Sequence, residues 1–182
     1  MNFYIADMHL GHEAIIPYDS RPFLSVNEMN RILISNWNRK VGQDDDVYII
    51  GDFSYRSETD PVWYLEQLKG KKHLIQGNHD GQWLKDGRAM SHLVSVDKML
   101  FVRDGRENIV LCHFPIAEWN GFRHGSWHIY GHIHAWRSRT SDFMDAQRKA
   151  LNAGCMLNGY EPVTFAELVE NHKKRITGGI GE

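Results

Sequence analysis

The chain has 182 residues, of which 42% are hydrophobic and 24% are charged, and its formal net charge is -2 at pH 7. This balance indicates a globular domain rather than a disordered chain, and it offers no bulk charge with which to coat nucleic acid or a membrane surface. Two cysteines are too few for a disulfide framework, and no continuous apolar stretch is long enough to span a bilayer, so we expect a cytoplasmic protein without a signal peptide.

The first eighty residues alternate between predicted strands and helices. Short apolar runs predict three buried strands, at residues 3–6, 47–50 and 72–76. Apolar residues at helical spacing predict one helix from a cap at Ser25 or Asn27 to about residue 40, and another from 62 to about 69, capped by Asp60. Strands that alternate with helices imply a parallel sheet with right-handed crossovers.

The second half of the chain is richer in short strands. They are predicted at residues 94–96, 98–102, 108–112, 127–130 and 149–153. Asp104-Gly105 predicts a hairpin turn between two of them. A last helix is predicted from Phe165 to about residue 173, with Thr164 and Glu167 as a capping box, and residues 176–182 are expected to form a loose tail. We therefore predict one domain that spans residues 1–182.

Side chains that bind metals follow the carboxyl ends of five predicted strands. They are Asp7, His9, Asp52, Asn78, His79, His113, His132 and His134. Ligands gather at the carboxyl ends of strands in open α/β sheets, so these side chains are expected to converge, although a simple turn explains each short stretch when it is taken alone. Imidazole nitrogens with carboxylate oxygens suit manganese, iron, zinc or nickel better than calcium or magnesium.

The sequence resembles the calcineurin-like metallophosphoesterases in five motifs, which keep the order of that family. They are Asp7-Met8-His9, Gly51-Asp52, Gly77-Asn78-His79-Asp80, His113 and Gly131-His132-Ile133-His134. The resemblance covers residues 7–134 and departs at Tyr55, where the second motif commonly carries another polar ligand. It implies an α/β fold, a four-layer αββα sandwich of two mixed β-sheets flanked by helices.

The resemblance also implies a role for each residue. One ion would be held by Asp7, His9, Asp52 and His134, and the other by Asp52, Asn78, His113 and His132. His79 would act as the general acid toward the leaving group, with Asp80 orienting its ring. The implied reaction is hydrolysis of a phosphate ester by a metal-bridged hydroxide, with two divalent ions as cofactors and manganese as the expected one. A short chain suggests an open site, which slightly favours phosphodiesters.

Charge and side-chain chemistry agree with this interpretation. Two divalent ions, the carboxylates of Asp7 and Asp52 and a bridging hydroxide leave about one net positive charge, which attracts a phosphate oxyanion. The predicted substrate contacts, through stacking or phosphate pairing, are His12, Arg21, Arg123 and His124, with Trp119 as a further aromatic. The expected partner is a small phosphate ester or nucleotide. A membrane is not expected as a partner, and the sequence does not decide whether nucleic acid is one.

Other interpretations explain less of the sequence. A phosphomonoesterase of the same family would differ only in its substrate. A metallo-β-lactamase-type site requires His-x-His-x-Asp-His, which Ala135-Trp136-Arg137 breaks after His134, and an iron oxygenase needs only two histidines and one carboxylate. A catalytically silent metal-binding scaffold for a protein partner would be favoured by loss of His79 or Asp52, and both are present. The sequence predicts neither the physiological substrate nor the oligomeric state.

Overall fold

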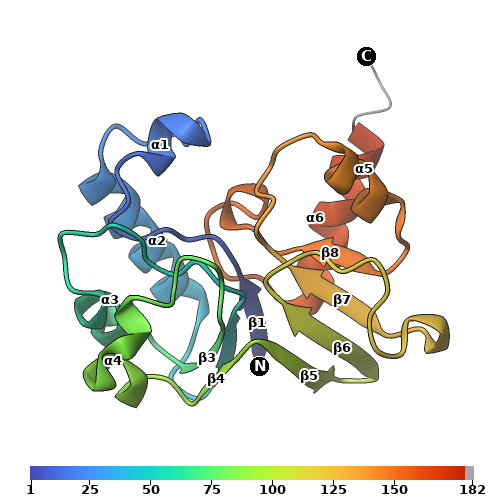
Figure 1. Ribbon diagram of the computed structural model, residues 1–182, viewed down its shortest axis with the longest axis horizontal. Helices are drawn as coiled ribbons and strands as arrows, with labels where there is room; N and C mark the ends of the chain where they lie inside the picture. The colour runs from blue at the N-terminus through green and yellow to red at the C-terminus, as the bar shows by residue number, and fades with distance from the viewer. Residues whose placement is uncertain (179–182) are drawn as a thin grey trace.

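Two four-stranded sheets lie at the centre of the computed structural model, which describes residues 1–178 (Figure 1). The strands are β1 (Asn2–Ile5), β2 (Asp46–Ile49), β3 (Lys71–Ile75), β4 (Ser95–Asp97), β5 (Met99–Asp104), β6 (Glu107–Cys112), β7 (Trp127–Tyr130) and β8 (Ala150–Asn152). The sheet orders are β1-β2-β3-β4 and β5-β6-β7-β8. The ladders of the first sheet are parallel, whereas the second is mixed, because β5 runs antiparallel to β6. An isolated antiparallel bridge joins Tyr4 to Val163 beside the first sheet.

Within residues 1–178, six α-helices accompany these sheets. They are α1 (Ile15–Tyr18), α2 (Val26–Lys40), α3 (Pro61–Gln67), α4 (Gly87–Ser91), α5 (Arg139–Ala146) and α6 (Phe165–Gly178). The predicted caps are present: the side chain of Ser25 accepts a hydrogen bond from the backbone N–H of Glu28, and that of Asp60 accepts one from Val62. Thr164 and Glu167 form the reciprocal bonds of a capping box at α6.

Alternation along β1 separates two cores. Phe3 and Ile5 pack with buried residues of α2 and α3, including Trp37, whereas Tyr4 faces the second sheet. Trp37 is fully buried, and its Nε1 donates a hydrogen bond to the backbone oxygen of Lys69. Burial of one large apolar side chain stabilises the fold by roughly 1.5–3 kcal/mol. The helices between the strands therefore hold the first sheet from its outer side.

The other two layers are the second sheet and its cover. Val110 and Tyr130 on the outer face of that sheet pack with Met144 of α5 and with Trp119 of the segment between β6 and β7. In contrast, α6 contributes Leu168 to the core between the sheets. Figure 1 shows α2, α3 and α4 on one side of the paired sheets and α5 on the other, which confirms the predicted αββα architecture.

The main differences from the sequence prediction concern short helices and the carboxyl terminus. Three helices, α1, α4 and α5, were not predicted, because segments of four to eight residues are too short for a clear helical period. The loose tail is wrong for residues 176–178, which form the last turn of α6, while residues 179–182 lie outside the described part of the chain. In residues 1–178 no helix combines the length and the hydropathy that crossing a membrane requires.

Candidate metal centre

Three glycines let the loops after β2, β3 and β7 approach one another closely. A Cβ atom on Gly51 would lie 2.3 Å from Nδ1 of His113, and one on Gly77 would lie 2.3 Å from Oδ1 of Asp52. A Cβ atom on Gly131 would lie 2.7 Å from Oδ2 of Asp7. No side chain fits at such distances, so each glycine makes room for a functional group supplied by a neighbouring loop.

Five of the predicted ligands have left-handed backbone conformations, although none is glycine. The φ angles are 56° for Asp7, 52° for His9, 54° for Asp52, 70° for His132 and 50° for His134. Positive φ is uncommon for residues with a side chain, and such strain persists only where the surrounding structure enforces it. Its concentration at these positions indicates that the fold holds the side chains in place at some cost, as functional sites commonly do.

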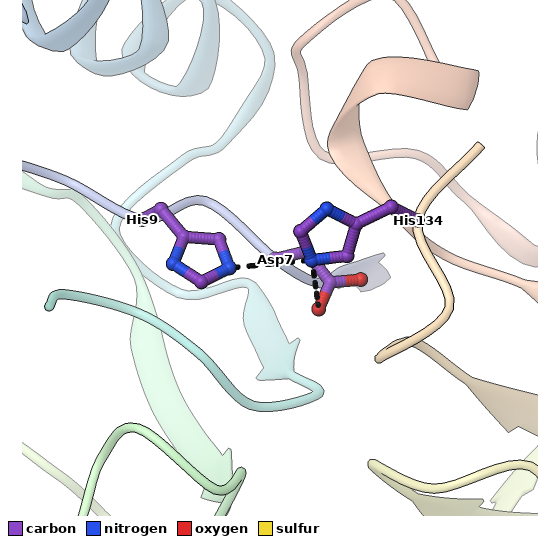
Figure 2. A group of neighbouring side chains, drawn as sticks. All are labelled: Asp7, His9 and His134. Carbon is purple, nitrogen blue, oxygen red and sulfur yellow. Dashed lines mark hydrogen bonds and ion pairs between the residues drawn. The ribbon is translucent and has the colours of Figure 1, made fainter. Parts of the chain in front are cut away.

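Asp7, His9 and His134 point toward one another from the loops after β1 and β7 (Figure 2). Nε2 of His134 lies 3.3 Å from Nε2 of His9 and 3.7 Å from Oδ1 of Asp7. All three residues are buried, and one possible ligand atom from each lies within 4.8 Å of the others. This group is therefore spaced to hold a metal ion.

Asp52 connects this group to a second one. Its Oδ2 lies 3.7 Å from Nε2 of His9 and 3.4 Å from Nε2 of His113. The side-chain oxygen of Asn78 lies 3.1 Å from Nε2 of His113 and 3.0 Å from Nδ1 of His132. Asp7, Asp52 and His113 also lie within ligand distance of one another, so the two predicted ligand sets form one continuous cluster rather than two separate ones.

The hydrogen bonds of two histidines show which ring nitrogen is free for a metal. Nδ1 of His134 lies 2.7 Å from a carboxylate oxygen of Asp19, and Nδ1 of His113 lies 2.9 Å from the backbone oxygen of Ile50. Both acceptors lack a proton to give, so each Nδ1 must donate. In a neutral ring the Nε2 lone pair then points into the cluster, as in metal-binding histidines.

This arrangement leaves lone pairs facing lone pairs. The free Nε2 of neutral His113 faces oxygens of Asp52 and Asn78. The free Nε2 of neutral His134 lies 3.3 Å from Nε2 of His9, which carries a proton in only one of its neutral tautomers. Nδ1 of His9 is buried and has no hydrogen-bond partner within residues 1–178. A proton or a cation between these atoms removes the repulsion, so the residues fit a metal centre.

Titration of the two carboxylates agrees with a demand for positive charge. Burial raises the pKa of Asp7 to about 6. Burial also acts to raise the pKa of Asp52, but the hydrogen bond and charge of His113, the backbone N–H of His79 and the charge of His9 together outweigh it, and the pKa falls to about 2. Burial opposes the charge on His113, yet Asp52 and Asp7 raise its pKa to about 9. The buried carboxylates therefore attract a proton to His113, and a metal ion would supply the same positive charge.

Asp80 does not orient the ring of His79, so that prediction is wrong. Its buried carboxylate accepts hydrogen bonds from the backbone N–H groups of Asp52 (2.8 Å), Phe53 (3.0 Å) and Gly77 (2.8 Å), and from Nε1 of Trp83 (3.0 Å). These four donors use the acceptor positions of the carboxylate. Asp80 thus fastens the loop after β2 to the loop after β3, and it positions Asp52.

The ring of His79 is held by packing instead. It packs against Tyr55 with ring centroids 3.9 Å apart and the rings tilted by 39°, and its Nε2 lies 3.9 Å from Oδ2 of Asp52. Its backbone N–H donates to Oδ1 of Asp52 at 2.9 Å. Tyr55 stands at the position where the family resemblance breaks, and no sequence signal linked it to His79.

Arg21 is not a substrate contact, which corrects the prediction. It is only 4% exposed, and its guanidinium donates to the backbone oxygens of Asp7 and Met8 at 2.9 Å each. It also pairs with Asp19 at 2.9 Å, and Asp19 in turn accepts the hydrogen bond from His134. Asp19, a supporting residue that the sequence did not single out, looks like an ordinary loop aspartate until the fold brings it to His134.

Arg123 and His124 also lie away from the metal centre. The chain leaves β6 at its carboxyl end and must return to the amino end of the parallel strand β7, and these two residues come just before that strand. His124 lines a separate hollow beside β5, and Trp119 is buried. The prediction of substrate contacts therefore fails for both residues, whereas His12 lies beside the cluster.

A cavity of about 580 Å³ opens onto the cluster. Its walls include His9, His79 and His134, together with the predicted contact His12. They also include residues that the sequence analysis did not assign, namely Tyr18, Tyr55, Arg56, Trp136 and Arg137. The cavity therefore combines the candidate ligands with aromatic and cationic walls.

Comparisons with known proteins find relatives by sequence and similar folds among solved structures. No protein-family model matches it. The uncharacterized protein MJ1445 of Methanocaldococcus jannaschii is 32% identical over 170 residues, which cover 92% of this chain and 89% of that protein. The solved structure of AQ665 from Aquifex aeolicus, a protein of unknown function, shares the fold with a TM-score of 0.74 at 21% identity, covering 93% and 98% of the two chains. A solved archaeal phosphodiesterase is a looser likeness, with a TM-score of 0.49 at 17% identity over 85% of this chain and 84% of that one.

Proposed function

We propose that the chain, which shares a family with MJ1445, is a calcineurin-like metallophosphoesterase that hydrolyses phosphate esters with the help of two divalent metal ions. The observation that carries the proposal is the convergence of buried carboxylates and imidazoles whose free nitrogens face one centre. Such a cluster is costly unless a cation occupies it, and it opens onto a cavity that a substrate can enter.

The proposal assigns the ligands to two ions. Asp7, His9 and His134 would hold one, while Asn78, His113 and His132 would hold the other, with Asp52 shared between them. Manganese is the expected ion, with iron, zinc and nickel as the alternatives, because a ligand set of imidazoles and oxygens without a thiolate suits these metals better than calcium or magnesium. When bound, the ions supply positive charge to the phosphoryl oxygens and a water-derived nucleophile near neutral pH.

His79 is assigned to proton transfer. Its side chain is 32% exposed, faces the cavity and lies just outside the ligand set. A protonated imidazole at that place can give its proton to the departing oxygen of the ester. Packing on Tyr55 and the backbone bond to Asp52 keep the ring in register with the ligands. An open cavity leaves room for a substituent on each side of the phosphorus, which supports a preference for diesters.

The test is hydrolysis by protein that has been stripped of metal with a chelator and then reloaded. Manganese, nickel, zinc, iron(II) or magnesium is added back, and bis-p-nitrophenyl phosphate is compared with p-nitrophenyl phosphate. We expect turnover to return with manganese and to be faster on the diester. Faster turnover of the monoester would make the protein a phosphomonoesterase. Two bound ions per chain without turnover of any phosphate ester would favour the scaffold interpretation.

A further inference from the structure

Two exposed aromatic side chains meet in the wall of the cavity. Tyr18 ends α1, and Trp136 lies in the segment between β7 and α5. Their ring centroids are 4.5 Å apart, yet the residues are 60% and 46% exposed. Single exposed aromatics are common on protein surfaces and need no explanation. A contacting pair from two distant segments, facing the same cavity as the metal centre, is a platform on which a flat group can be buried.

The platform lies next to the candidate ligands. The ring of Trp136 is 6.4 Å from the ring of His134, centroid to centroid. The backbone oxygen of His134 accepts a hydrogen bond from the side-chain amide of Asn152 at 2.9 Å, which anchors this segment to the end of β8. A group attached to a phosphate at the metal centre would therefore reach the platform without crossing the protein.

The charge around the platform restricts what it can bind. Aromatic pairs also attract cations, but Arg137 and Arg56 line the same cavity, and both would repel one. The side chain of Arg137 is 64% exposed and lies 3.5 Å from Asp145, whose carboxylate is already engaged by Arg175 at 2.7 Å. Arg137 is thus available to an anionic or electron-rich ligand. A neutral, flat ring attached to an anionic phosphate group can stack on the aromatic pair and bring its negative charge to Arg137.

We propose that Tyr18, Trp136 and Arg137 form a subsite for the nucleobase of a nucleotide whose phosphodiester lies at the metal centre. The inference rests on the proposed function, and it names the substrate class. Every base offers a π face, so stacking on such a platform tolerates all bases. Because Arg137 is the one charged side chain in the subsite, we expect little preference among them.

Two diesters with the same leaving group test the subsite. One is the p-nitrophenyl ester of thymidine 5′-monophosphate, and the other is methyl p-nitrophenyl phosphate, which has no base. We expect Trp136→Ala to lower kcat/KM for the nucleotide ester by roughly 5- to 150-fold, the range for loss of one stacked base, and to leave the methyl ester within about twofold. Trp136→Phe should restore most of the rate. Trp63→Ala is the matched control, because Trp63 is 50% exposed but lines a different hollow.

The result can overturn the subsite without overturning the activity. An unchanged rate on the nucleotide ester, or an equal loss on both esters, would exclude stacking on Trp136. If the wild-type protein hydrolyses neither ester with any metal, the proposed activity fails, and calorimetry then decides the subsite. Thymidine 5′-monophosphate should bind the manganese-loaded protein more tightly than 2-deoxyribose 5-phosphate, and Trp136→Ala should remove the difference. Equal affinity of the wild-type protein for the two would overturn the subsite.

Discussion

The metal centre and the cavity wall beside it are built in different ways. Asp7, Asp52 and His113 are buried, each comes within a few residues of a strand end, and each has hydrogen-bonded partners that hold it. Tyr18 lies at the end of α1 and Trp136 lies two residues beyond His134, and both are about half exposed. The centre is therefore held by many residues at once, whereas the wall can change without disturbing it. Substitutions should separate catalysis, which depends on the centre, from substrate choice, which depends on the wall.

Replacement of the shared ligand should have the largest effect. Asp52→Asn removes the negative charge that lies between His9 and His113, so we expect the protein to lose at least one ion. Hydrolysis should fall by roughly 10⁴-fold or more, because both the positive charge and the nucleophile depend on the ions. Metal content by mass spectrometry and the rate on bis-p-nitrophenyl phosphate measure this. Asp44→Asn, on an exposed loop, is the control, and full metal content in Asp52→Asn would contradict the shared role.

Replacement of the proposed acid should leave the metals in place. His79→Ala keeps every ligand, so we expect normal metal content and a rate about 10²- to 10⁴-fold lower. The loss should be smallest for p-nitrophenyl esters, whose leaving group needs little help from a proton, and largest for alkyl esters. The control is His92→Ala, a partly exposed histidine at the end of α4. An undiminished rate on an alkyl ester would remove His79 from the mechanism.

Replacement of Asp80 tests whether this residue positions Asp52 or orients the ring of His79. Asp80→Asn places an amide group among four donors, so backbone N–H groups of the loops after β2 and β3 lose an acceptor. We expect metal affinity to fall by about 10- to 100-fold, as for other residues that support ligands. At saturating metal the rate should recover. A rate that stays low with both ions bound would restore the orienting role toward His79.

The same difference in construction explains which parts of the site could be predicted from the sequence. Asp7 and Asp52 follow apolar strands directly, and parallel strands bring their carboxyl ends to one edge, so local pattern and topology suffice. The role of Asp80 depends on backbone groups of another loop, which no local pattern records. Trp136 and Tyr18 become neighbours only when α1 and the segment after β7 are placed in space.

The three wrong predictions of substrate contacts have two causes, which are burial of a charged side chain and the path of the chain after β6. A loop arginine normally lies in solvent, but Arg21 is buried because two backbone oxygens and Asp19 satisfy its guanidinium. Arg123 and His124 follow the strand β6 in sequence, yet the return of the chain to the start of β7 carries them away from the strand ends. Position in the sequence predicts membership of the site only for residues that directly follow the carboxyl end of a strand.

The smallest expected effect concerns the support behind the cavity wall. Burial acts to raise the pKa of Asp145, but its hydrogen bond and ion pair with Arg175 outweigh this and lower the pKa. A lowered pKa means that the pair stabilises the fold above the unfolded-state pKa of about 3.9, and that this contribution is lost as the pH falls through the lower folded-state value.

Asp145→Asn should therefore reduce the free energy of unfolding at pH 7 by about 1 kcal/mol, since the pair is partly exposed. In urea unfolding, the difference in unfolding free energy between the variant and the wild-type protein should begin to shrink below about pH 4. Metal content at pH 7 should be unchanged, because Asp145 contacts the wall through Arg137 and none of the ligands. A loss of metal in this variant would show that the wall and the centre are coupled after all.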